Sequence, residues 1–226
     1  MKKKAPQHSF QAHPWHGVDP GEDAPATVTA FIELVPTDAV KYELDKETGI
    51  LRLDRPQQFS SQCPTPYGFI PRTFCGTQVA KRAAERTGLK DIQGDGDPMD
   101  ICVLTEKVIT SGNLLVRAVP IGGFRMVDGN EADDKILAVL ESDLAYGEIV
   151  HMAQAPRAMV DRLKHYFLTY KQIPGEGKRK VEIAEVYDRP EALEVIRRSM
   201  KDYQGLYGSA TPRASKPRRK RSLNRK

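Results

Sequence analysis

The chain has 226 residues, 39% of them hydrophobic, which suits one globular domain of moderate size. No apolar run approaches the ~20 residues that span a bilayer, and no apolar segment follows the basic start MKKKAPQHSF. Three widely spaced cysteines favour neither a disulfide framework nor a zinc knuckle. We therefore expect a cytoplasmic protein without a membrane span.

The positive charge is concentrated at the two ends of the chain. The whole chain has a net charge of +5, and the tail TPRASKPRRKRSLNRK (211–226) carries eight cations. Without the tail the net charge is −3, and without the three lysines at positions 2–4 as well it is −6. The folded body is therefore predicted to be acidic. We expect an arm over residues 1–26, one domain over 27–207, and a basic, disordered tail over 208–226 with weak polyanion contact as its possible role.

The first part of the chain alternates strand-like and turn-like runs. The arm is rich in Pro, His and Gly and is expected to be anchored by Trp15. Residues 78–88 have helical composition, end in Gly88, and are predicted to form a helix within an insertion at about 76–94. Runs rich in Val, Ile, Leu and Tyr between turn residues predict strands at 28–35, 40–44 and 50–55.

The later part of the chain changes from strands to helices. Further strands are predicted at 99–108, 113–127, 135–142 and 180–187, and amphipathic helices at 157–172 and 190–208. Strands first and helices late predict a mainly β, α+β protein, in which helices pack outside a closed or partly closed β-barrel.

Two predicted strands place a charge on an apolar face. The period of two puts Arg55 with Leu51 and Leu53, and Glu33 with Phe31. A buried charge must find a partner or line a polar cavity, because an unpaired one is costly. The strands alone leave both a Glu33–Arg55 salt bridge and a cavity open.

The stretch GDGDPMD (94–100) has three interpretations. Gly, Asp and Pro are ordinary turn residues, so an acidic surface turn is the simplest. A calcium loop would use Asp95, Asp97 and Glu106, but Met99 would occupy a ligand position and a strand follows instead of a helix. The third is a magnesium site, since Mg²⁺ prefers hard oxygen ligands and phosphate.

A second acidic cluster, MVDGNEADDK (126–135), favours the magnesium interpretation, because so many carboxylates would repel each other without cations. Basic residues are interleaved with the acids, and Arg and Lys both bind phosphate oxygens. The pattern predicts a cavity for divalent metals and a highly charged oxyanion. The acids of the second cluster are Asp128, Glu131, Asp133 and Asp134, and the interleaved cations are Lys41, Arg55, Lys135 and Lys171.

In these residues the chain resembles the soluble family I inorganic pyrophosphatases. The stretch DGDPMDI (95–101) matches the family signature Asp-x-Asp-Pro-apolar-Asp-apolar, and the resemblance covers about residues 15–207. The other motifs occur in the family's order: IELVP with Glu33, VKYEL with Lys41 and Glu43, LDR with Arg55, PYGFIP with Tyr67, MVDGNEADDK, and TYK with Tyr170 and Lys171.

The resemblance implies hydrolysis of inorganic pyrophosphate to two orthophosphates by a metal-activated water, an OB-like five-stranded barrel, and a homo-oligomer. Asp97 resembles the family's general base. The implied metal is Mg²⁺, several ions per site, for which Mn²⁺ or another divalent ion can substitute. Metal ligands by resemblance are Asp95, Asp100, Asp128 and Asp133, with Glu33 acting through water; the substrate-binding residues are Lys41, Arg55, Tyr67, Lys135, Tyr170 and Lys171.

One departure from the family lies near Tyr67. Many relatives have a tyrosine four residues earlier, where this chain has Cys63, so one hydroxyl contact to phosphate is expected to be missing.

A rival interpretation is an OB-like binding module for nucleic acid or anionic surfaces. The sequence disfavours it, because every motif carboxylate is present, the body is acidic and no aromatic-rich strand occurs. A nucleotide-binding enzyme is disfavoured by the absence of GxxxxGK[ST] and GxGxxG motifs.

Overall fold

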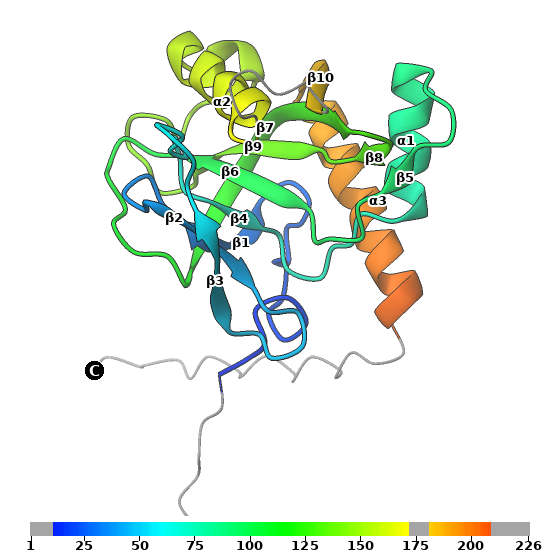
Figure 1. Ribbon diagram of the computed structural model, residues 1–226, viewed down its shortest axis with the longest axis horizontal. Helices are drawn as coiled ribbons and strands as arrows, with labels where there is room; N and C mark the ends of the chain where they lie inside the picture. The colour runs from blue at the N-terminus through cyan, green and yellow to red at the C-terminus, as the bar shows by residue number, and fades with distance from the viewer. Residues whose placement is uncertain (1–10, 172–180, 209–226) are drawn as a thin grey trace, which may run out of the picture.

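The structure is a computed structural model and describes residues 11–171 and 181–208 (Figure 1). The predicted tail from residue 209 onward and the end of the predicted helix at residue 172 lie outside the described residues. The strands are β1 (Val28–Leu34), β2 (Val40–Leu44), β3 (Leu51–Pro56), β4 (Tyr67–Phe69), β5 (Gln93–Gly94), β6 (Asp100–Leu104), β7 (Leu114–Asp128), β8 (Glu131–Ala132), β9 (Lys135–Leu140) and β10 (Val181–Asp188). The helices are α1 (Thr77–Thr87), α2 (Arg157–Thr169) and α3 (Arg189–Tyr207), with a short 3₁₀ turn, η1 (Met152–Gln154).

Five strands close into a ring. The order is β1–β4–β6–β9–β7, and β7 returns to pair with β1, so this part of the sheet has no free edge. All of these pairs are antiparallel except β6–β9. With α1, α2 and α3 outside the ring (Figure 1), the prediction of a mainly β, α+β fold built on a five-stranded barrel is confirmed.

Strand β9 shows how both faces of the barrel wall become buried. Ile136 and Ala138 pack in a cluster that includes side chains of α1 and α3, whereas Leu137 and Val139 pack in a cluster with Leu163 of α2. The alternation follows the period of two in a strand. Such a continuous apolar run needs cover on both faces, which is why the helices lie outside it.

The β2–β3 hairpin forms its own two-stranded sheet beside the barrel (Figure 1). Lys41 pairs with Arg55 and the next residue, Tyr42, with Leu53, so Asp54 is an extra, bulged residue. The bulge reverses the phase of the strand, and Leu53 is 57% exposed. The expectation that Leu53 and Arg55 share an apolar face was therefore wrong.

The N-terminal segment from residue 11 lies against the body. The indole of Trp15 is buried, and its Nε1 donates to Thr73 O over 2.8 Å. The side chain also stacks with His16 and contacts Tyr207 of α3 edge to face. Trp15 thus anchors the segment as the sequence predicted.

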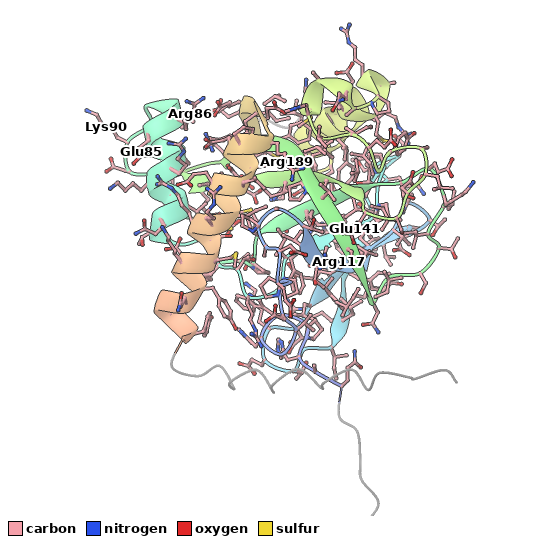
Figure 2. All side chains as sticks on the ribbon, turned by 180° about the vertical axis from the view of Figure 1, so that it is seen from behind. Glu85, Arg86, Lys90, Arg117, Glu141 and Arg189 are labelled. Atoms are coloured by element: carbon pink, nitrogen blue, oxygen red, sulfur yellow. The ribbon has the colours of Figure 1, made fainter. Side chains whose placement is uncertain are left out.

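Helix α1 receives its N-terminal cap from a distant residue. Both Figures show α1 beside α3, and Figure 2 places Glu85 and Arg86 on α1. The carboxylate of Asp202 in α3 accepts from the backbone N–H groups of Gly76 (3.1 Å), Gln78 (3.0 Å) and Val79 (3.1 Å). These donors have no partner inside the helix, and the negative charge also suits the helix dipole.

The Asp202→Ala variant is therefore expected to lower the free energy of unfolding by about 1–2 kcal/mol, the usual cost of losing a helix cap. Urea unfolding followed by circular dichroism measures it. Asp161→Ala on α2 is the matched control, because Asp161 lies on the surface with ion pairs of 3.6 and 3.9 Å, and a change below about 0.5 kcal/mol is expected. Equal losses in both variants would contradict the capping role.

No helix in residues 11–171 or 181–208 is long and apolar enough to cross a membrane.

Candidate active site

A cavity of about 330 Å³ opens between the β2–β3 hairpin, the barrel and the C-terminal end of α2. Carboxylates, cations and phenols line it together, and most of the cations pair with carboxylates. Ten of the twelve residues predicted for the site line it: Glu33, Lys41, Arg55, Tyr67, Asp97, Asp100, Asp133, Lys135, Tyr170 and Lys171. The structure thereby brings together residues from distant parts of the sequence.

Asp95 and Asp128 do not line the cavity, but each contacts a residue that does. The Oδ1 of Asp95 accepts from the backbone N–H of Asp97 over 2.9 Å. The Oδ2 of Asp128 accepts from Lys171 Nζ over 2.7 Å. Each carboxylate is therefore one hydrogen bond away from the residues that line the cavity.

The two glycines of GDGDPMD occupy positions that other residues do not fit. A Cβ on Gly94 would lie 2.0 Å from the carbonyl oxygen of Cys75, so no larger residue fits there. Gly96 has φ +75°, a conformation that favours glycine. Met99, which follows, is fully buried and donates its N–H to Thr73 Oγ1 over 2.8 Å. The stretch is thus anchored in the core and is not a solvated turn.

Strand register places Lys135 beside two of the carboxylates. The parallel β6–β9 pair aligns Asp100 with Lys135, whose Nζ donates to Asp100 Oδ2 over 2.5 Å and also to Asp133 Oδ1. Burial acts to lower the pKa of Lys135, but Asp100 and Asp133 outweigh it and raise the pKa well above its ordinary value. Lys135 therefore stays charged between the two carboxylates.

The carboxylates outnumber the buried cations around them. Burial raises the pKa of Glu33 to about 8, although Leu44 N donates to its Oε1 over 2.7 Å. Burial, and then the charge of Asp133, raise the pKa of Asp95; burial also raises the pKa of Asp100. The site is therefore electrostatically suited to additional positive charge.

The donor chemistry fits a divalent metal, because carboxylate oxygens are the hard ligands that Mg²⁺ and similar ions prefer. Within residues 11–171 and 181–208, however, no three carboxylate, imidazole or thiol groups are arranged as a metal-binding cluster. Lys135 lies between Asp100 and Asp133 instead.

Further lining cations come from the hairpin and from the end of α2. Lys41 Nζ lies 3.4 Å from Glu43 and 3.3 Å from Asp54, and Arg55 also pairs with Asp54. The Arg55 guanidinium lies 5.9 Å from the centre of the Tyr170 ring. No Glu33–Arg55 ion pair is present among the described residues, so the cavity alternative for these two charges is the correct one.

Comparisons with known proteins agree with this geometry. A family model described as inorganic pyrophosphatase matches residues 30–204. The chain belongs to the inorganic pyrophosphatase family. It is 50% identical over 200 residues to the inorganic pyrophosphatase of Chlamydia trachomatis serovar D, covering 87% of this chain and 96% of the relative. It is 35% identical to soluble inorganic pyrophosphatase 2 of Chlamydomonas reinhardtii, covering 87% and 91%.

A solved pyrophosphatase structure also matches over most of this chain. The crystal structure of the Thermus thermophilus inorganic pyrophosphatase superposes with a TM-score of 0.72 at 27% identity, covering 86% of this chain and all of that one. The recognition of a soluble family I inorganic pyrophosphatase from the sequence motifs is confirmed. Membership of this family implies dependence on a divalent metal.

The pyrophosphatase site contains residues that the sequence analysis did not assign. Lys46, in the turn of the hairpin, contacts Asp97, and Asp54 holds both Lys41 and Arg55. A lysine in a turn and an acid before an arginine are common surface patterns, so neither carried a signal in the sequence. The other unassigned lining residues with charged or aromatic side chains are Trp15, Glu43, Phe69, Tyr166 and Phe167.

Cys63 lies beside the cavity without lining it. The thiol is buried, donates to Thr65 O over 3.3 Å and packs in the same cluster as Leu34 and Cys102. Burial raises the pKa of this thiol to about 12, so it stays protonated at neutral pH. Cys63 therefore acts as a small core residue of this pyrophosphatase.

Proposed function

We propose that this chain hydrolyses inorganic diphosphate to two orthophosphates with the assignment of roles given below. The supporting observation is the cavity of about 330 Å³ in a pyrophosphatase-family fold, which is lined by carboxylates together with Lys, Arg and Tyr side chains. Diphosphate is highly charged and repels an anionic nucleophile, so hydrolysis requires that both charges be neutralised in one place.

The carboxylates of the site would hold the divalent ions. Asp95, Asp100 and Asp133 would bind the first ion, with Asp100 shared with a second. Asp128 and Asp133 would bind one that arrives with substrate, and Glu33 would act through water. Mg²⁺ suits these hard oxygen donors. Such ions lower the pKa of water from ~15.7 toward neutrality and stabilise negative charge on the leaving phosphate.

The cationic and phenolic side chains would hold the substrate. Lys41 and Arg55 exchange their contacts with Asp54 for phosphate oxygens, which suit a bidentate guanidinium and a point-charge ammonium. Burial, followed by the charge of Asp100, raises the pKa of Tyr67 well above its ordinary value, so its hydroxyl remains a donor. Lys135, Tyr170 and Lys171 complete this group.

Asp97 would accept the proton from the attacking water. Its side chain is 42% exposed at the cavity, in contrast to the buried Glu33. Lys46 contacts Oδ1, and no hydrogen bond to Oδ2 occurs within the described part of the chain. One carboxylate oxygen is therefore available for a proton.

We also infer a cytoplasmic homo-oligomer, with weak polyanion contact through the basic tail. The support is the family resemblance and the eight cations of residues 211–226. Sedimentation of the purified protein tests assembly. Unchanged affinity for RNA after truncation at residue 210, measured at low salt, would remove the role of the tail.

Phosphate release from pyrophosphate by the purified wild type tests the function and its metal requirement. We expect rapid release with Mg²⁺, complete loss after treatment with EDTA, and recovery when Mg²⁺ is restored, because the carboxylates need cations. Circular dichroism before and after EDTA shows whether the fold survives. An inactive wild type in the presence of Mg²⁺ would overturn the proposed function.

A further inference from the structure

The turn of the β2–β3 hairpin reaches the proposed base. Lys46 lies in this turn, and its Nζ pairs with Asp97 Oδ1 across the mouth of the cavity, which both residues line. The two side chains are 49% and 42% exposed, so they meet at the edge of the site and not in the core. The contact joins residues 51 positions apart in the sequence.

The turn itself is held in one conformation. Asp45 Oδ1 accepts from the backbone N–H and the hydroxyl of Thr48 over 2.9 and 2.7 Å. The N–H of Gly49 donates to Asp45 O over 2.8 Å, and Gly49 has φ +71°. These bonds fix the direction in which Lys46 leaves the backbone.

The N-terminal segment contacts the same turn through His13. The Nε2 of His13 lies 3.2 Å from Lys46 O, and a Cβ on Gly49 would lie 2.8 Å from the imidazole ring. Two residues later, Trp15 donates to Thr73, which in turn accepts from Met99 beside Asp97. One segment therefore contacts the hairpin turn directly and is linked through Thr73 to the backbone that carries the base.

We propose that Lys46 is a positioning residue for Asp97, held in place by His13 and the hairpin turn. This inference rests on the proposed role of Asp97 as proton acceptor. An aspartate that is partly exposed can rotate about two side-chain bonds, and only some orientations place an oxygen at the cavity. The ion pair fixes Oδ1 and leaves Oδ2 free to accept the proton.

The position of Lys46 supports a role through Asp97. Burial acts to lower the pKa of Lys46, but the bond and charge of Asp97 outweigh it and raise the pKa, so the ammonium is charged. Lys41, Lys135 and Lys171 already supply ammonium groups to the cavity. A shift of ~1 Å in a catalytic group can cost ~10²-fold in rate, so a fixed base has a measurable effect.

The Lys46→Met variant is expected to lower kcat for magnesium pyrophosphate about 10- to 100-fold while KM changes less than about threefold. Lys46→Arg should recover most of kcat, because it restores a cation of similar reach. His13→Ala should give a smaller loss of the same kind. Lys107→Met is the control, since Lys107 is 81% exposed and pairs with Glu106 on the surface; it should match the wild type.

A double-mutant cycle with Asp97→Asn decides whether Lys46 acts through Asp97. In the Asp97→Asn background, Lys46→Met should cause no further loss of kcat. A full, multiplicative loss there would overturn the inference, because Lys46 would then act independently of Asp97. A rise in KM with unchanged kcat would also overturn it and would show that Lys46 contributes to substrate binding. If Lys46→Met is as active as the wild type while Asp97→Asn is inactive, the inference fails and the proposed function stands. If Asp97→Asn is fully active, the proposed base is wrong.

Discussion

Asp97→Asn is expected to lower kcat for pyrophosphate hydrolysis by ~10²–10⁴-fold, the usual contribution of a positioned general base. The amide has nearly the same shape as the carboxylate, so the backbone bonds of Asp97 to Cys75 (2.7 Å) and Asp95 (2.9 Å) should persist. The loss should therefore appear in kcat and not in folding. Initial rates of phosphate release over a range of Mg²⁺ and pyrophosphate concentrations measure it.

Asp161→Asn is the control for this substitution, because Asp161 lies on the exposed face of α2 and should leave kcat unchanged. Thermal unfolding of both variants checks that the fold is intact. If Asp97→Asn keeps more than about a tenth of the wild-type kcat, the proton is taken by another group.

Arg125→Met is expected to lower the free energy of unfolding by about 3–5 kcal/mol, the cost of removing one partner from a buried ionic group. The Arg125 side chain is fully buried. It donates to Glu185 and Glu191 over 2.6 Å each, lies 3.4 Å from Asp134 and stacks 5.0 Å from the centre of the Tyr187 ring. The substitution leaves three carboxylates around an apolar side chain.

The loss should grow as pH rises above about 7. Burial raises the pKa of Asp134 to about 7 even though Arg125 opposes it. Without Arg125 this pKa rises further. Up to about pH 7 the Asp134 carboxyl is protonated in both folded proteins and costs each the same stability, so the difference between variant and wild type grows only above about 7, where wild-type Asp134 ionises.

Glu191 changes the stability with pH in the direction opposite to Asp134. Burial acts to raise its pKa, but hydrogen bonds from Arg82 and Arg125 lower it to about 2. The stability that Glu191 adds is therefore present above its unfolded pKa and is lost as pH falls toward 2. Removing Arg125 weakens this contribution at neutral pH.

Urea unfolding at several pH values measures both effects. Arg86→Met is the control, because Arg86 is 46% exposed and its bond is to Glu185 at the surface; a loss below about 1 kcal/mol is expected. Equal losses for the two variants, or a loss independent of pH, would show that the buried group around Arg125 is not a coupled network.

The long elements of the fold were predictable from sequence, and short or irregular ones were not. The helix predicted at 78–88 is observed at 77–87, and the strand predicted at 113–127 is observed at 114–128. Periodicity is clear in such segments. Strand β4 was missed because its three residues lie among prolines in PYGFIP, and the bulge at Asp54 because one extra residue changes no composition.

The charged residues of the candidate site were predictable from sequence where they belong to a motif. The order of the motifs predicted Asp100, Asp133 and Lys135; strand register aligns Asp100 with Lys135, and Lys135 pairs with both aspartates. Lys46 was not found, since its partner is fixed by the path of a turn and of the N-terminal segment, which a pattern of two or three residues does not encode. Tertiary contacts of this kind require the folded chain.

The closure of the barrel has a consequence for how the chain reaches its native state. Strand β7 pairs with β1, aligning Val28 with Ala118, and it also pairs with β9 and β10 farther along the chain. The ring therefore cannot close until more than half of the chain has been synthesised. Contacts so distant in sequence slow folding, and until β7 arrives one edge of β1 is exposed to pairing with other chains. The nascent protein is therefore most prone to aggregate between the synthesis of β1 and the synthesis of β7.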